Sequence, residues 1–178
     1  MNTEGRNLDV LFRILSSNQE QVRFADSKAT FVAALNALLF GFMATHFVSL
    51  KAIYTTYGLQ SFAFCGPFVV IALYVISSMT SLLLAVWGVM PRFGGHAPRS
   101  KIYFEHIVRD YGKDYGKYGQ DVNKMTESDW VQDLGTQVVE VSHIILAKHT
   151  CVRSAATLVP ITALLWALSF VVLLMVRP

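Results

Sequence analysis

Charge is missing from three long stretches of this 178-residue chain, and this absence limits its structure more than any other feature. Residues 29–50, 62–90 and 155–176 contain no Asp, Glu, Lys or Arg. A helix needs about 20 apolar residues to cross the hydrocarbon core of a bilayer, and a single strand could not satisfy its backbone hydrogen bonds there. The missing charge therefore excludes an ordinary water-soluble fold and predicts three membrane helices.

Cysteines and catalytic motifs are also scarce. The two cysteines, Cys65 and Cys151, are predicted to lie near opposite faces of the membrane, so they form neither a disulfide framework nor a zinc site. The sequence has no Walker loop, HExxH, nucleophile elbow or CxxC. Its spans also lack the carboxylate or lysine that a proton-coupled carrier uses. We therefore expect a protein that is not an enzyme or a simple transporter and that has no cofactor or metal.

Positive charge is distributed unevenly around the three spans. Of the 15 Lys and Arg residues, all except Lys51 and Arg177 precede the first span or lie between the second and the third. By the positive-inside rule, the N-terminus and residues 91–154 are cytoplasmic, and the turn at 51–61 and the C-terminus face outside. The net charge is only +3, which argues against a nucleic-acid partner.

Two apolar stripes at helical spacing lie on the cytoplasmic side. In segment 1–28 the stripe consists of Leu8, Leu11, Phe12, Leu15 and Val22. The second stripe follows a helix-start signature at Thr126 and Asp129 and consists of Val131, Leu134, Val138, Val141, Ile145 and Lys148. We predict an all-α membrane protein in which the first and third membrane helices extend into a small cytoplasmic helical head and pair there. A first stripe that lies on lipid and a second stripe that joins copies of the chain are the alternatives.

The remainder of the head is less regular. Residues 102–109 predict one short helix. The stretch 111–119 nearly repeats Tyr-Gly-Lys and predicts a solvated loop, because glycines at this density oppose both helix and strand. A loop that grips a ligand is the alternative, since tyrosine stacks on bases and lysine binds phosphate.

Small residues recur every four positions in the first span, at Ala29, Ala33, Ala37 and Gly41, with Asn36 beside them. Such a stripe lets two membrane helices approach closely. We favour packing against the other two spans, and a contact between subunits is the alternative.

Several short motifs occur in an order that resembles one known family. They are Phe24, Asp26 and Lys28 at the entrance of the first span, Asn36 within it, Pro91-Arg92 after the second span, Tyr103-Phe104 in the cytoplasmic segment, and Asp133-Leu134 and Lys148 before the last span. In the order and placement of these motifs, the chain is similar to the transmembrane effectors of Pycsar anti-phage systems.

The resemblance implies an antiviral defence protein of the bacterial inner membrane. Such effectors are understood to sense cyclic UMP or cyclic CMP made by a partner cyclase and then to impair the membrane, which causes abortive infection. We also expect a homo-oligomer, because three spans cannot enclose a wide channel. A pore former that needs no nucleotide, and a membrane scaffold that docks a cytoplasmic partner, are the alternative functions.

A cyclic mononucleotide requires a cation for its phosphate and an aromatic side chain for its base. Chemistry and placement give as candidates Arg92, Arg109 and Lys148 for the phosphate, and Tyr103 or Phe104 for the base. Asp26 and Lys28 are instead predicted to form a structural ion pair at the membrane boundary, although Lys28 can also extend toward lipid headgroups.

Overall fold

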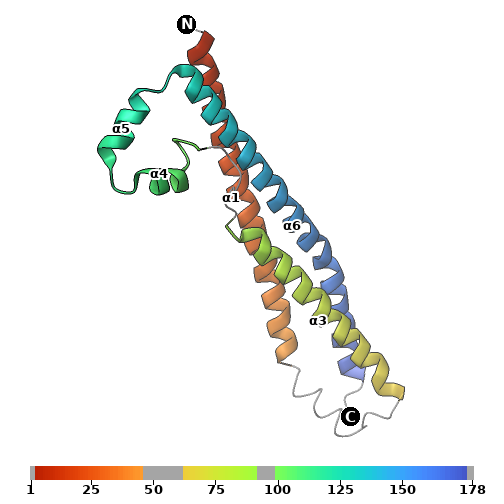
Figure 1. The fold of residues 1–178 in the computed structure, drawn as a ribbon. Coiled ribbons are helices and arrows are strands. Elements are labelled where there is room, and N and C mark those ends of the chain that lie inside the picture. Colours follow the sequence, from red (N-terminus) through yellow and green to blue (C-terminus); the bar gives the residue numbers. More distant parts are fainter. Residues whose placement is uncertain (1–2, 46–61, 92–98, 176–178) are drawn as a thin grey trace. The chain divides into compact units, whose positions relative to one another are not determined.

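The computed structural model describes residues 3–45, 62–91 and 99–175, and these parts are mostly helical (Figure 1). In chain order the helices are α1 (Thr3–Ala44), α3 (Phe62–Val89), α4 (Phe104–Tyr111), α5 (Tyr115–Asn123) and α6 (Glu127–Met175). No strand occurs in the described ranges. The predicted all-α fold class is confirmed.

Three of these helices contain segments that are long and apolar enough to cross a membrane. The segments are Gly5–Ala44, Phe68–Val89 and Glu127–Val172. They belong to α1, α3 and α6, which are the helices that contain the predicted spans. The predicted turn at 51–61 and the end of the first predicted span lie outside the described residues.

The chain divides into two compact units, which we describe separately. The head unit consists of Met1–Phe24 and Pro91–Ala147, and the membrane unit consists of Ala25–Met90 and Lys148–Pro178. Helices α1 and α6 each contribute one part to each unit, whereas α3 belongs to the membrane unit alone.

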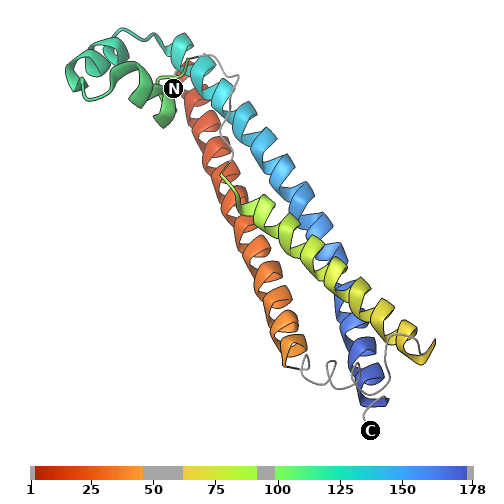
Figure 2. The same cartoon turned by 60° about the horizontal axis from the view of Figure 1, so that its bottom comes forward.

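In the membrane unit, α1, α3 and α6 lie side by side (Figures 1 and 2). Their buried positions mostly recur at intervals of three or four residues, which is the spacing of a helix bundle. These positions are Ala25, Ala29, Val32, Asn36 and Met43 on α1, Tyr74, Ser78, Ser81 and Ala85 on α3, and Lys148, Val152, Ala155, Thr162 and Ser169 on α6. We call this set the seam. Many of its side chains are small, which allows close helix contact without a bulky core.

The small-residue stripe of α1 follows the seam only at its beginning. Ala29 is buried, but Ala37 and Gly41 are exposed on the surface of the chain. The predicted packing against the other spans is therefore wrong for the second half of the stripe. A strict four-residue period drifts away from a packed face whose average period is shorter. Helices α3 and α6 instead approach each other closely at Gly88 of α3, where an added Cβ would lie 3.3 Å from the side chain of Val152.

Aromatic side chains pack beside the seam on α6. Trp166 is half-buried and stacks on Phe170 with a ring-centroid distance of 6.0 Å. Phe42 of α1 lies 6.4 Å from the same indole. Trp166 also packs against the buried pair Met43 and Tyr74. Helix α6 itself runs through Pro160 without ending.

In the head unit, α6 begins with the predicted capping box. The hydroxyl of Thr126 accepts a hydrogen bond from the N–H of Asp129 at 3.3 Å, and the Asp129 carboxylate accepts one from the N–H of Thr126 at 2.8 Å. The amide of Asn18 on α1 donates to the hydroxyl of Ser142 on α6 at 3.0 Å. Leu134 is fully buried in the predicted stripe. The predicted pairing of α1 with α6 in the head is therefore confirmed.

The glycine-rich stretch 111–119 differs from its prediction as a loop. Its second half forms the start of α5, because Asp114 caps this helix by accepting a hydrogen bond from an N–H of the first turn at 2.9 Å. The ring of Tyr118 also packs edge-on against Tyr111 at 5.2 Å. Gly112, with φ of +55°, ends α4. Capping and ring contacts thus offset the backbone freedom of the glycines.

Candidate functional site

The turn before α4 is held in place by Ser100. Its hydroxyl accepts hydrogen bonds from the N–H groups of Ile102 and Tyr103, both at 3.1 Å, and its own N–H donates to Nδ1 of His106 at 3.1 Å. Ser100 and His106 are both buried. This side-chain turn explains why α4 begins two residues later than the helix predicted at 102–109.

Lys101, the next residue, is held by three separate groups. Its N–H donates to Oδ2 of Asp133 at 2.8 Å, and its carbonyl accepts from the hydroxyl of Tyr118 at 2.9 Å. Its ammonium binds the hydroxyl of Tyr111, which donates to Oδ2 of Asp121 at 3.0 Å. The segment before α4 is thereby attached to α5 and to the beginning of α6.

These hydrogen bonds also shift the pKa values of the charged side chains that they join. The bond to Tyr111 raises the pKa of Lys101, and the bond from Tyr111 lowers the pKa of Asp121. Hydrogen bonds from Thr126 likewise lower the pKa of Asp129. All three ionisable groups are therefore charged at neutral pH. Opposite charges lie 3.7 Å apart between Lys101 and Asp121.

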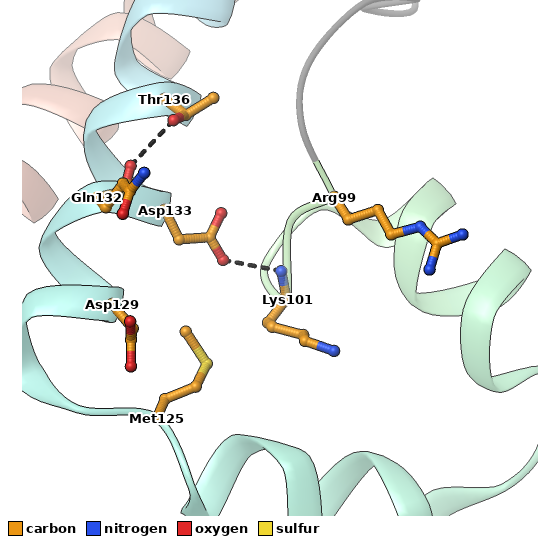
Figure 3. A pocket seen from close by; sticks show the side chains of 7 residues that line it. All are labelled: Arg99, Lys101, Met125, Asp129, Gln132, Asp133 and Thr136. Atoms are coloured by element: carbon orange, nitrogen blue, oxygen red, sulfur yellow. Dashed lines mark hydrogen bonds between the residues drawn. The ribbon is translucent and has the colours of Figure 1, made fainter.

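A pocket of about 320 Å³ opens between this segment and the beginning of α6 (Figure 3). It is lined by Arg99, Lys101, Met125, Asp129, Gln132, Asp133 and Thr136. The polar residues from α6 are spaced three and four apart, so they share one face of the helix. The two cationic residues come from the opposite wall (Figure 3). The volume lies at the lower end of the usual range for small-molecule sites, about 300–1,000 Å³.

The two walls of the pocket differ in charge. The side chain of Arg99 is 80% exposed, and its guanidinium forms a long ion pair with Asp110 at 3.9 Å. In Figure 3 the side chain of Arg99 points away from α6, the helix that carries Gln132 and Asp133. The ammonium of Lys101 is already used in the network described above. The pocket thus has a cationic wall with Arg99 and Lys101, and a wall on α6 with the carboxylates of Asp129 and Asp133 and the hydrogen-bonding groups of Gln132 and Thr136.

A second cluster of charge lies in the membrane unit, around Lys148. The Lys148 ammonium is buried, 2.5 Å from Oδ1 of Asp26, and it donates to the carbonyls of Gly88 and Val89 at 3.0 and 3.3 Å. These contacts occupy all three N–H donors. The two carbonyls lie at the end of α3, where the negative end of the helix dipole favours a cation.

Comparison with known families identifies the family of the chain. A family model described as the Pycsar effector protein domain matches residues 10–175, which include most of both units. The chain belongs to the Pycsar effector family. No curated protein and no solved structure matches it. The resemblance seen in the sequence motifs is confirmed. Family membership assigns this Pycsar effector to anti-phage defence, and with its three apolar helices it places the protein in a membrane.

The residues predicted to bind nucleotide in this Pycsar effector lie apart from the pocket wherever they are described. Tyr103 is half-buried against Phe104, with a ring-centroid distance of 5.0 Å, and Phe104 is exposed. Arg109 is exposed, and its guanidinium lies 3.2 Å from Asp110. Arg92 lies outside the described residues. These residues remain predicted ligand contacts, whereas Lys148 has no donor left for a phosphate in this conformation.

The predicted ion pair of Asp26 with Lys28 is wrong, because the effector pairs Asp26 with Lys148. Residues two positions apart on a helix point to different sides, so Asp26 and Lys28 do not face each other. Lys28 is exposed on α1. The partner of Asp26 is distant in sequence and adjacent in the fold.

The other two residues of the opening motif differ in their surroundings. Asn36 is buried, and its amide donates to the hydroxyl of Ser81 at 3.0 Å. Its carbonyl oxygen accepts from the hydroxyl of Ser78 at 3.4 Å. Phe24 is exposed. In this Pycsar effector Asn36 therefore connects α1 to α3 inside the membrane unit.

Sequence analysis did not identify the pocket residues of the effector, although part of their pattern is visible. The polar face of α6 consists of Asp129, Gln132, Asp133 and Thr136. A polar helix face usually meets solvent, so this pattern alone indicates no site. Placing Arg99 opposite that face depends on the Ser100 turn and on the hydrogen bond from Lys101 to α6.

Proposed function

We propose that this Pycsar effector senses a cyclic pyrimidine mononucleotide, cyclic UMP or cyclic CMP, through its head unit and then impairs the inner membrane. The observation that carries the proposal is the family match over residues 10–175, because it includes head and membrane units together. A partner cyclase supplies the nucleotide during infection, and the damaged cell stops growing before phage mature. In this proposal the protein binds a signal and has no enzymatic step.

The head unit faces the cytoplasm in this proposal, where the product of a cyclase accumulates. The charge distribution supports this orientation, because most Lys and Arg residues precede the first span or lie within 91–154. Alkaline phosphatase, which is active only in the periplasm, should be active when fused to the C-terminus and inactive when fused to the N-terminus. The opposite result would contradict the orientation.

The head pocket is the place where we expect the nucleotide to bind. A guanidinium can contact a phosphate through two parallel hydrogen bonds, and the exposed Arg99 can supply them. The amide of Gln132 offers both donors and an acceptor, so it can pair with the edge of either pyrimidine. Met125 adds an apolar surface to the same pocket.

Calorimetry on the detergent-purified full-length protein tests the proposal. Cyclic CMP and cyclic UMP should be compared with cyclic AMP, and saturable binding of at least one pyrimidine nucleotide is expected. Arg99→Ala should weaken binding about tenfold or more, since a hydrogen bond to a charged group contributes about 1.5–3 kcal/mol. Gln132→Ala should weaken it by about two- to tenfold, since a neutral hydrogen bond contributes about 0.5–1.5 kcal/mol. Lys113→Ala, which changes an exposed head residue outside the pocket, is the matched control.

The same titration distinguishes binding in the pocket from binding at the other residues that the sequence predicts. Loss of binding in Arg92→Ala, Tyr103→Ala or Arg109→Ala, with wild-type binding in Arg99→Ala, would move the site away from the pocket. Absence of saturable binding by the folded wild-type protein would contradict nucleotide sensing. The remaining functions would then be a pore that needs no nucleotide or a scaffold for a cytoplasmic partner.

In this proposal the effector acts on the membrane as a homo-oligomer. One bundle of α1, α3 and α6 has a packed seam and does not enclose a wide channel. Vesicles that contain the protein and a trapped dye should release the dye when cyclic CMP or cyclic UMP is added. The size of the cross-linked protein in the same vesicles should correspond to a homo-oligomer. A sealed membrane together with tight nucleotide binding would favour the scaffold function.

A further inference from the structure

In the membrane unit most large apolar side chains face outward, whereas several polar side chains are buried between the helices. The buried polar residues of the described membrane unit are Asn36, Ser78, Ser81, Lys148, Thr162 and Ser169. Some of them connect the three helices: Ser81 accepts from Asn36 and donates to the carbonyl of Ala155 at 3.0 Å, whereas Ser169 bonds to a carbonyl of its own helix. The hydroxyls of Ser77 and Thr162 lie 2.8 Å apart. A polar line therefore runs along the seam between helices.

Among the described residues of the seam, the Tyr74 hydroxyl makes no hydrogen bond with good geometry. Its oxygen is buried, and the hydroxyl of Ser78, one turn further along α3, lies close to it without a well-aligned hydrogen bond. Tyr74 packs instead against Met43, Leu165 and Trp166. A buried hydroxyl without a well-aligned hydrogen bond is unfavourable and rare, and it would gain one if water entered the seam.

The outward face of the membrane unit is mainly apolar, and the hydroxyls of its exposed residues Thr30, Thr80 and Thr157 bond to carbonyls of their own helices. Its most exposed large residues include Phe31, Leu38, Phe42, Ile76, Leu83, Leu164 and Leu168. A constriction lined by such side chains excludes water and closes a channel to ions. A passage formed by joining outward faces of several copies would be lined mainly by these apolar groups.

We propose that the leak path of this effector opens along its own seam. This inference rests on the proposed function and adds the residues that line the path. Separation or rotation of the helices would expose Asn36, Ser81 and Thr162 to water and give the Tyr74 hydroxyl a well-aligned hydrogen bond. The seam between Lys148 and Ser169 on α6 is about 30 Å long at about 1.5 Å per residue, which equals the thickness of the hydrocarbon core. The polar line is thus long enough to carry water and small ions across.

The competing explanation is that these polar groups only hold the helices together, as interhelical hydrogen bonds do in many membrane bundles. The two explanations differ in whether water reaches the seam when the membrane leaks. A thiol reacts through its thiolate, which forms in contact with water and is suppressed in an apolar surrounding. The reactivity of a cysteine placed in the seam therefore reports on the presence of water.

The experiment uses the full-length protein in dye-loaded vesicles, with Cys65→Ala and Cys151→Ala as the background. Single cysteines are introduced in the seam by Ser81→Cys and Thr162→Cys. The matched controls, Leu83→Cys and Leu164→Cys, lie two residues further on the same helices and are each 63% exposed on the outward face. A charged, membrane-impermeant methanethiosulfonate reagent is added with and without cyclic CMP or cyclic UMP.

The proposal expects seam cysteines to react at least about tenfold faster when the nucleotide causes dye release, with no change at the outward controls. Dye release with protected seam cysteines would overturn the seam path and leave the proposed function intact. Dye release with faster reaction at the outward cysteines alone would place the path between copies and also overturn the proposal. Vesicles that stay sealed with both nucleotides would overturn the proposed function and the seam path together.

Discussion

The ammonium of Lys148 and the carboxylate of Asp26 form an ion pair at 2.5 Å although the two residues are far apart in the chain. The same ammonium donates to the carbonyls of Gly88 and Val89, which end α3. Helix α3 has no basic residue in its own last turn, so the cation that its C-terminus favours comes from α6. One side chain thereby joins all three helices of the membrane unit.

Lys148→Met should destabilise the membrane unit by about 2 kcal/mol or more, because it removes charged hydrogen bonds and leaves Asp26 without its partner. The change is measurable as a lower midpoint of unfolding in detergent. Arg153→Met, at an exposed position on the same helix, serves as the control and should leave the midpoint unchanged. Equal effects of the two substitutions would show that the contacts of Lys148 contribute little.

Asn36→Leu should weaken contact between α1 and α3 by about 1 kcal/mol, the usual size of an interhelical hydrogen bond in a membrane protein. Ser81 would keep its bond to the carbonyl of Ala155, so the loss should be moderate. The shift in unfolding midpoint should be compared with that of Ala37→Leu, which changes an exposed neighbour. A larger shift for Ala37→Leu would indicate that the outward face is in contact with another copy.

Leu134→Asp should unfold the head unit, because a carboxylate buried without a partner costs more than about 3 kcal/mol. Leu134 has no exposed surface, whereas Val139 on the same helix is 55% exposed. Val139→Asp should therefore be tolerated. Limited proteolysis distinguishes the two variants. Only Leu134→Asp should be cut within residues 91–147, while its membrane helices remain protected.

Asp114→Ala should unwind the beginning of α5 with a loss of about 1 kcal/mol, because it removes the N-terminal cap of a helix that contains two glycines. Hydrogen exchange of the backbone amides in 115–123 should become faster. Gln120→Ala, an exposed change in the same helix, should leave exchange unchanged or slower. Unaltered protection in Asp114→Ala would show that ring packing alone maintains α5.

The contact of Tyr111 with Lys101 and Asp121 should make the stability of the head depend on pH in two windows. The pKa of Asp121 is lowered, so its stabilising effect is present above about pH 4 and is lost as the pH falls further. The pKa of Lys101 is raised, so its effect is present below about pH 10.4 and is lost at higher pH. The protection factors of the backbone amides in α4 and α5, which account for the pH dependence of intrinsic exchange, should be constant between these limits. Tyr111→Phe should weaken both transitions, and unchanged transitions in this variant would contradict the role of the hydroxyl.

The parts of the fold that follow from local sequence were predictable. An uncharged run of sufficient length predicts a span wherever it occurs, and this condition identified segments of α1, α3 and α6. The capping box at Thr126 and the apolar stripe with Leu134 are also local patterns. Family motifs such as Asn36 could be recognised by their order in the chain.

The remaining features depend on contacts between segments that are distant in sequence. The stretch 111–119, which includes the first part of α5, reads as a loop because Gly116 and Gly119 outweigh the capping of Asp114 when the ring contacts of Tyr118 are unknown. Lys28 was chosen as the partner of Asp26 because it is near in sequence, whereas the ion pair forms with Lys148 on another helix. The pocket likewise requires two segments that only the folded head brings together.

The placement of the three tryptophans gives the protein a set of native optical reporters. Trp130 is half-buried in the head unit, Trp87 faces outward from the membrane unit, and Trp166 stacks on Phe170 beside the seam. Variants that keep one tryptophan at a time would report separately on the head, the lipid-facing surface and the interior of the bundle. Wetting of the interior would appear as a red shift in the emission of Trp166 without any attached dye.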